Sequence, residues 1–230
     1  MWQQVQAGDR VLAVTFFADA PAPGAPLSPF ARELHARWDR SSGTTNRRRE
    51  DVAALSALGV GAIHWPYADC IYRQALDGRF LYANEEALWG EIHPEEEGLI
   101  EELVCRLAAL PLARGGTVYP PLGVGHHVDH RIVRRAAEFS QRTRIYYEEF
   151  PYAEDPQAVQ AALAQRPGLA QLVHISEEAL EAKIAAIARY RSQLSTFWDG
   201  TAEMAAAVRA FAERTGGAGP AERYWQLDVL

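Results

Sequence analysis

The sequence predicts an α/β fold: a Rossmann-like, mostly parallel sheet with flanking helices and a helical appendage at the C-terminal end. One observation is that short apolar runs alternate along the chain with longer segments of helical spacing. The first run, residues 11–17, is apolar apart from one threonine, as in a strand buried on both faces. The second is that 230 residues with 48% hydrophobic content can bury one large core. We therefore expect a single domain over residues 1–230.

The expected elements follow the order strand–helix along the first two thirds of the chain. Strands are predicted at residues 11–17, 61–67, 116–120 and 144–150, and helices at 46–58 (with Asn46 as the cap), 95–110 and 128–140. Residues 69–90 have little periodicity and carry the turn dipeptide Asp77-Gly78, so we expect a long excursion with at most a short hairpin. The appendage, at about residues 175–230, contains helices at 177–191 and 202–214.

Composition excludes several classes of partner. The chain has 30 acidic and 23 basic residues, a net charge of −7, which argues against electrostatic binding of nucleic acid or of an anionic membrane. The apolar runs are too short to predict a membrane span. Only Cys70 and Cys105 are present, so we expect neither a disulfide framework nor a cysteine-rich metal site, and we expect a cytoplasmic location.

A histidine cluster follows the predicted strand at 116–120. The segment Gly123-Val124-Gly125-His126-His127-Val128-Asp129-His130 contains three of the seven histidines, all at positions 126–130. His127 and His130 are spaced i, i+3 at a helix start, so both can face one cleft, and Asp129 could cap the helix or fix a histidine tautomer. The pattern favours a metal or acid–base site. The structural alternative is a solvated helix cap rich in histidine.

The same loop partly resembles a dinucleotide-binding fingerprint. Gly123-Val124-Gly125 follows a strand and opens a helix, but Val128 stands at the third glycine position. Two imidazoles would also lie where the backbone must approach a pyrophosphate. A nucleotide-binding α/β protein is therefore only a minor alternative.

Several spaced motifs together resemble the zinc-dependent PIG-L / LmbE-like N-deacetylases, which remove acetyl groups from N-acetylated sugars and related amides. The resemblance begins at the strand at 11–17 and covers nearly the whole chain. Its motifs are Arg47-Arg48-Arg49-Glu50 with Leu58-Gly59, Asp69-Cys70-Ile71-Tyr72-Arg73, Gly125-His126-His127-Val128-Asp129-His130-Arg131, Tyr146-Tyr147-Glu148, Lys183 with Tyr190, Ser192 and Gln193, and Glu222-Arg223-Tyr224-Trp225.

The resemblance implies roles for five residues. His130 would be a zinc ligand, and His127 would polarise the amide carbonyl and stabilise the oxyanion, with Asp129 holding its imidazole. Asp69 and Arg73 would lie in the substrate pocket, although a surface ion pair between them is an equally good interpretation. The implied function is a zinc-dependent hydrolase that removes an N-acetyl or other N-acyl group from an amino sugar or glycoconjugate. A homo-oligomer is compatible with the sequence.

One departure from the family pattern concerns the metal. The family's other two zinc ligands and its general base come from a His-Pro-Asp-Asp type motif after the first strand, and residues 1–9 contain no histidine and no paired carboxylates. His93-Pro94-Glu95 looks superficially similar but is better explained as a helix start. The chain thus supplies one expected ligand where a catalytic zinc takes about three. Either the motif precedes this sequence, or the protein is an inactive sugar-binding relative without the metal site.

Overall fold

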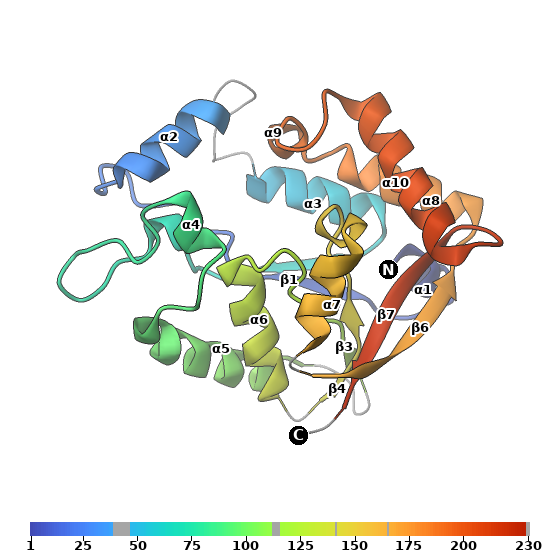
Figure 1. Ribbon diagram of the computed structural model, residues 1–230, viewed down its shortest axis with the longest axis horizontal. Coiled ribbons are helices and arrows are strands. Elements are labelled where there is room, and N and C mark those ends of the chain that lie inside the picture. The colour runs from blue at the N-terminus through green and yellow to red at the C-terminus, as the bar shows by residue number, and fades with distance from the viewer. Residues whose placement is uncertain (39–46, 112–115, 141, 165, 229–230) are drawn as a thin grey trace. The chain divides into compact units, whose positions relative to one another are not determined.

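The computed structural model describes residues 1–38, 47–111, 116–140, 142–164 and 166–228. The chain divides into two compact units. Figure 1 labels its helices and strands. Unit 1 comprises Met1–Arg73 and Val173–Glu222, and unit 2 comprises Gln74–Leu172 and Arg223–Leu230. None of the helices within the described ranges is both long and apolar enough to cross a bilayer.

Unit 1 contains a two-stranded parallel sheet and most of the C-terminal helices. Thr15 of β1 lies opposite His64 of β2, and the helix α3 makes the crossover that a parallel pair requires. The elements are α1 (Trp2–Gln6), β1 (Leu12–Thr15), α2 (Pro29–Trp38), α3 (Arg47–Ala57), β2 (Gly61–His64), the 3-10 helix η2 (Cys70–Tyr72), α8 (Glu177–Ile187), α9 (Arg191–Leu194) and α10 (Thr201–Gly216).

The core of unit 1 forms where α3 packs against α8. Ala54, Leu55 and Leu58 recur at helical spacing along one side of this segment, and all three are buried. Ala186 of α8 belongs to the same cluster, which α1 covers with partly buried side chains. Gly59, with φ 72°, ends the helical segment in the left-handed conformation that glycine adopts easily. This packing fixes the position of β2, which follows directly.

Unit 2 combines helices with short strands. β3 pairs in parallel with β4, a bridge between Pro121 and Tyr147 continues that pairing, and β5 pairs antiparallel with β7. The elements are α4 (Glu85–Leu88), the 3-10 helix η3 (Pro94–Glu96), α5 (Glu97–Ala109), β3 (Thr117–Val118), α6 (Val128–Glu138), β4 (Thr143–Arg144), β5 (Tyr146–Tyr147), the 3-10 helix η4 (Tyr152–Glu154) and α7 (Pro156–Ala164), with β6 (Gly168–His174) and β7 (Ala221–Leu227) running across the unit boundary.

Two features fix the framework around the histidine cluster in unit 2. The helices α5 and α6 pack together through fully buried residues such as Leu103 and Ile132. After β5, the buried Glu148 carboxylate accepts hydrogen bonds from Arg223 Nε at 2.5 Å and Trp225 Nε1 at 2.8 Å. A charge-assisted pair of this kind holds β7 beside β5. The loop between β3 and α6 is therefore anchored by both helix packing and the sheet.

The predicted mixture of helices and strands is confirmed, and the predicted Rossmann-like parallel sheet is not clearly present among the described residues. The chain is a mixture of helices and strands, and the alternating elements predicted up to residue 150 have counterparts in β1, α3, β2, α5, β3, α6, β4 and β5. The predicted short hairpin after residue 69 corresponds to an antiparallel bridge between Gln74 and Phe80. Within the described ranges the strands form three small sheets. The predicted cap Asn46 lies outside the described residues.

The predicted helical appendage is wrong for its last part. Residues 221–227 form β7, and residues 168–174, for which we predicted no element, form β6. Glu222 and Arg223 have good helix propensity, but backbone pairing of Tyr224 and Trp225 with β5 overrides it. Tertiary pairing therefore decides the conformation of this segment.

Candidate functional site

The loop between β3 and α6 is built around a buried carboxylate. Gly123 N–H donates to Glu149 Oε1 at 2.9 Å, and Val124 N–H donates to Glu149 Oε2 at 3.2 Å. The side chain of Glu149 is only 5% exposed. These N–H groups are the donors that a dinucleotide phosphate would need. Since a carboxylate already occupies them, the arrangement argues against the nucleotide-binding alternative.

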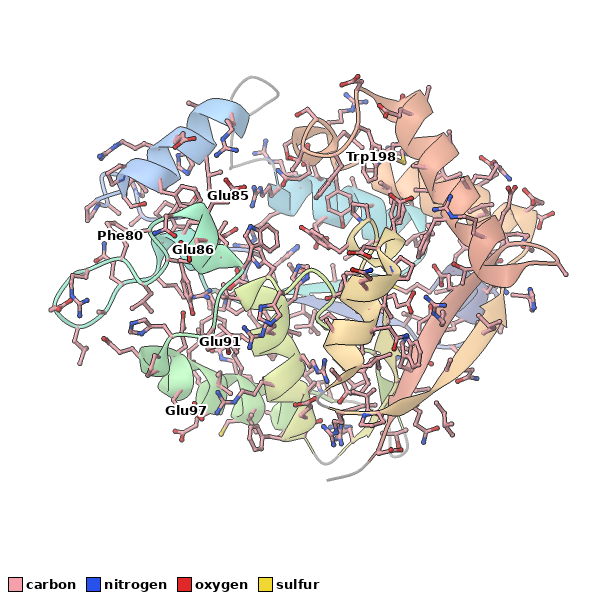
Figure 2. All side chains as sticks on the ribbon, in the orientation of Figure 1. Phe80, Glu85, Glu86, Glu91, Glu97 and Trp198 are labelled. Carbon is pink, nitrogen blue, oxygen red and sulfur yellow. The ribbon has the colours of Figure 1, made fainter. Side chains whose placement is uncertain are left out.

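The loop turns sharply before it enters α6. Gly125 and His126 both have positive φ, 82° and 67°, and His126 Nδ1 lies 2.8 Å from the carbonyl oxygen of Trp89. Arg131 donates to the carbonyl oxygen of Gly90 at 2.6 Å and forms an ion pair at 2.7 Å with Glu91. The pair lowers the pKa of Glu91, whose side chain is labelled in Figure 2. The residues before α5 thus fasten the turn from one side.

The substitution Gly125→Ala should destabilise this turn. A Cβ at position 125 would lie 2.6 Å from Cγ of Tyr152, and the residue would be held at φ 82°. The near part of the tyrosine ring cannot move aside without displacing η4. We expect a loss of about 2 kcal/mol or more in the free energy of unfolding, measured by denaturant titration. Gly78→Ala, at φ 84° but with open space around its Cβ, is the control and should lose only about 1 kcal/mol.

His130 has a defined hydrogen-bonding state. Its Nδ1 lies 3.2 Å from Glu149 Oε1, and its side chain is 36% exposed. A carboxylate accepts only, so Nδ1 carries a proton, and in the neutral ring Nε2 then has the lone pair. This carboxylate–histidine arrangement is the one that orients a metal-ligating imidazole. Nε2 of His130 can therefore act as a metal ligand or as a base.

His127 has the complementary tautomer. It is the N-cap of α6, and its Nδ1 accepts the backbone N–H of Asp129 at 3.3 Å. The proton of the neutral ring therefore lies on Nε2, which can donate. Its ring centroid lies 5.2 Å from those of His130 and Trp89. The predicted proximity of the two histidines is thus present, one presenting a donor and the other a lone pair.

Asp129 contacts His127 through its backbone. The resemblance implies that its carboxylate holds His127, and its backbone N–H donates to His127 Nδ1 at 3.3 Å. Asp129 is buried in the first turn of α6, where a negative charge is favourable. Its contribution to catalysis remains a prediction.

Asp69 and Arg73 lie in unit 1. Asp69 caps η2 by accepting the N–H of Ile71 at 3.3 Å and pairs with Arg47 at 3.4 Å. Arg73 donates to the carbonyl oxygen of Ala68 at 3.0 Å, and its guanidinium lies 4.7 Å from the ring centre of Phe17. The ion pair of Asp69 is thus with Arg47. Their role in substrate binding stays a prediction.

Unit 1 also contains a polar network that sequence reasoning missed. Asp51 accepts hydrogen bonds from Thr15 Oγ1 at 2.8 Å, His64 Nε2 at 2.7 Å and the Tyr190 hydroxyl at 2.5 Å. Burial, followed by the bond to Asp51, raises the pKa of Tyr190. The network ties the strand ends of β1 and β2 to the chain after α8. In the sequence, this network was indicated only by the match of Tyr190 to the C-terminal pattern of the PIG-L / LmbE-like family.

Neither unit by itself has, among its described residues, enough side chains to form a complete metal site. Within either unit taken alone, the described residues contain no group of three histidine, cysteine or carboxylate side chains arranged to bind one ion. In unit 1 the strand β1 leads into residues 16–20, Phe-Phe-Ala-Asp-Ala, which include one carboxylate and no histidine. That carboxylate, Asp19, lies 3.6 Å from Arg48. Unit 2 therefore fits one position of a zinc site, at His130, and not a complete catalytic site.

Tyr72 provides a pH-dependent signal in unit 1. Burial, with a smaller contribution from Asp69, raises the pKa of Tyr72 to about 12, and its hydroxyl lies 2.5 Å from His35 Nε2. Between pH ~10 and that value, the unfolded state loses the proton while the folded state keeps it, so stability should fall as the pH rises. Burial also raises the pKa of other tyrosines, such as Tyr190, so an absorbance titration of tyrosinate should show several late transitions, and Tyr72→Phe should remove the one near pH 12. If Tyr72→Phe leaves the titration curve unchanged, the assignment is wrong.

The fold is similar to that of solved deacetylases. The zinc-inhibited form of teicoplanin deacetylase Orf2 superposes with a TM-score of 0.81 at 25% sequence identity, covering 99% of this chain and 90% of that one. A deacetylase–teicoplanin complex gives 0.78 at 25% identity over 98% and 90% of the two chains. The A40926 pseudoaglycone deacetylase Dbv21 gives 0.73 at 26% identity over 99% and 89%. The chain therefore has a deacetylase fold along nearly its whole length.

The chain matches no protein-family profile, and no curated protein matches it.

Proposed function

We propose that the protein is a hydrolase that removes an N-acetyl or related N-acyl group from an amino sugar of a glycoconjugate. The observation that carries the proposal is the pair His127 and His130 with opposite tautomers, in a chain that shares its fold with deacetylases of glycopeptide antibiotics. A donor beside a lone pair is what amide hydrolysis requires, because the carbonyl oxygen gains negative charge while water is deprotonated.

His127 is assigned to the carbonyl. Its Nε2–H would donate to the amide oxygen and stabilise the charge of the tetrahedral intermediate. The backbone bond at Nδ1 keeps that proton in place, and Trp89 packs edge-to-face against the ring. Asp129 is assigned the supporting role of positioning the imidazole. Asp69 and Arg73 are the proposed contacts to the sugar.

His130 is the residue proposed to hold zinc, through Nε2. Zinc bound there would lower the pKa of a coordinated water toward neutrality. The PIG-L / LmbE resemblance supports this choice of metal, and the neighbour in its zinc-inhibited form is a deacetylase on which zinc acts. Because His130 is one ligand where about three are usual, the purified chain should hold well under one equivalent of zinc. A cytoplasmic location belongs to the same proposal, supported by the two free cysteines.

A second candidate is a sugar-binding relative without hydrolytic activity. The segment after β1 favours it, since Phe17 and Ala20 flank Ala18-Asp19 where a His-x-Asp-Asp sequence would need a histidine and a second aspartate. Such a protein would keep Asp69 and Arg73 for recognition and bind the glycoconjugate unchanged. Binding with no turnover is its signature.

The two candidates are separated by assaying the intact protein against N-acetylated amino-sugar conjugates. Free amine and acetate are measured as products, and zinc is determined on the same sample by elemental analysis. Release of both products, abolished in His130→Ala, supports the hydrolase. Calorimetric binding without product, unchanged by added zinc, supports the binding protein. A full equivalent of zinc that His130→Ala retains would contradict the assignment of His130 as the ligand.

A further inference from the structure

The strand β6 is an unusual edge. It is the end strand of the sheet β5–β7–β6 and runs beside β7 (Figure 1). Residues 169–174 are all exposed, including Leu169 at 75%, Leu172 at 48% and Val173 at 37%. Its sequence, Gly-Leu-Ala-Gln-Leu-Val-His, has none of the charged residues or prolines that normally protect an edge strand from pairing. Apolar side chains therefore stand exposed on both faces of this strand.

The direction of the backbone groups of β6 follows from its pairing with β7. Ile175 N–H donates to the Pro220 carbonyl at 2.9 Å, and Asp228 N–H donates to the Pro167 carbonyl at 3.0 Å, so the strands are antiparallel. In such a pair, alternate residues direct both N–H and C=O toward the partner strand. The odd-numbered residues of β6 thus face β7. The N–H and C=O groups of Gly168, Ala170 and Leu172 point away from it, and at the end of the strand the His174 carbonyl accepts a hydrogen bond from Gln3 Nε2 at 3.4 Å.

We propose that β6 pairs antiparallel with β6 of a second copy of this chain, around a two-fold axis at Gln171. In this register Leu169 lies opposite Val173 of the second copy, and Ala170 lies opposite Leu172. The outward backbone groups then form the hydrogen-bonded pairs, each exchanging two bonds. Gln171 lies opposite Gln171 of the second copy in a non-hydrogen-bonded pair. The strand is complementary to itself in both backbone and side chains.

Neighbouring registers are less favourable. A shift of one residue would oppose outward groups to inward ones and lose the hydrogen bonds. A shift of two would keep them but place Gln171 opposite Leu169 or Val173 and leave one end of each strand unpaired. The register centred on Gln171 pairs residues 169–173 of both copies and leaves the His174 carbonyl with Gln3.

The charge of the chain limits where a second copy could approach. Each chain has a net charge of −7, so two copies repel each other over most of their surface. The neutral strand β6 is a segment through which they can approach. Isologous contact across a two-fold axis is the commonest symmetry of soluble oligomers. The proposal is independent of the hydrolase assignment.

The first test is the molar mass in solution, measured by light scattering over a range of protein concentrations. We expect a monomer–dimer equilibrium. Ala170→Pro removes an outward N–H without touching the pairing to β7, and Leu172→Lys introduces an ammonium into the apolar contact. Each should raise the dimer dissociation constant at least about tenfold. Leu76→Lys, at a fully exposed leucine in unit 2, is the control. Circular dichroism and thermal melting verify that each variant is folded.

The second test reads the register by cross-linking in a Cys105→Ser background, which removes the exposed thiol. Gln171→Cys should form an intermolecular disulfide on mild oxidation, because residues directly opposite in a non-hydrogen-bonded pair lie within disulfide reach. Leu169→Cys, opposite Val173 of the second copy, should cross-link far less. A monomer at concentrations on the order of 100 μM, a dimer unaffected by Ala170→Pro, or equal cross-linking of the two cysteine variants would overturn the proposal.

Discussion

Replacing His127 with alanine is expected to slow deacylation by about 10²- to 10³-fold, the usual effect of removing one oxyanion donor. The reason is geometric: Nδ1 is engaged by the Asp129 backbone, so Nε2–H is the atom that the ring offers to a carbonyl. The zinc content should stay unchanged, because the ligand assigned in unit 2 is His130. Turnover and metal are measured on the same preparation. Asp129→Asn should have a smaller effect.

His93→Ala is the matched control for the His127 substitution. His93 caps η3 through the same contact, with its Nδ1 accepting the N–H of Glu95 at 3.2 Å. Each substitution therefore removes a histidine cap and should lower stability by a similar amount, about 1 kcal/mol. Only His127→Ala should affect turnover. If the two variants lose activity equally, His127 has a capping role and the oxyanion assignment is wrong.

Replacing Glu149 with alanine should have the largest effect on stability. The substitution leaves the N–H groups of Gly123 and Val124 without their acceptor and releases His130 from the carboxylate that orients it. Two buried donors and a broken charged pair together predict a loss of about 3 to 5 kcal/mol. Urea denaturation measures the loss. Any residual activity should be low, because both His130 and the loop lose their support.

Two variants bracket the Glu149 result. Glu149→Gln keeps one carbonyl oxygen as acceptor, so it should lose about 1 to 2 kcal/mol. Glu91→Ala removes an ion pair with Arg131 in which the glutamate is 82% exposed, so it should change stability by less than about 1 kcal/mol. A Glu149→Ala protein as stable as Glu91→Ala would mean that the carboxylate does not support the loop.

Local sequence signals account for the parts of the molecule that could be predicted. The strand conformation of the apolar segment at 11–17 is favoured by the side chains of the segment itself, and β1 lies inside it. The spacing of His127 and His130 places both on one turn of a helix, and their rings are neighbours. In both cases the pattern and its consequence lie within a few residues.

Long-range partners account for what could not be predicted. Glu149 follows a strand and resembles an ordinary surface glutamate, and its importance arises from donors 25 and 26 residues earlier in the chain. Asp51 likewise depends on Tyr190, 139 residues away. The strand β7 is specified by pairing with β5 and not by its own propensity. Such long-range contacts leave no periodic pattern in the neighbouring sequence.

We propose that the loop bearing His127 and His130 removes an acyl group from an amino sugar. A single-turnover experiment tests this, with the protein in excess over an N-acetylated amino-sugar conjugate and the products followed by mass spectrometry. The intact protein is expected to convert the conjugate to the free amine, and a variant with both His127→Ala and His130→Ala should leave it unchanged. Unchanged conjugate with the intact protein, or equal conversion by the double variant, would contradict this proposal.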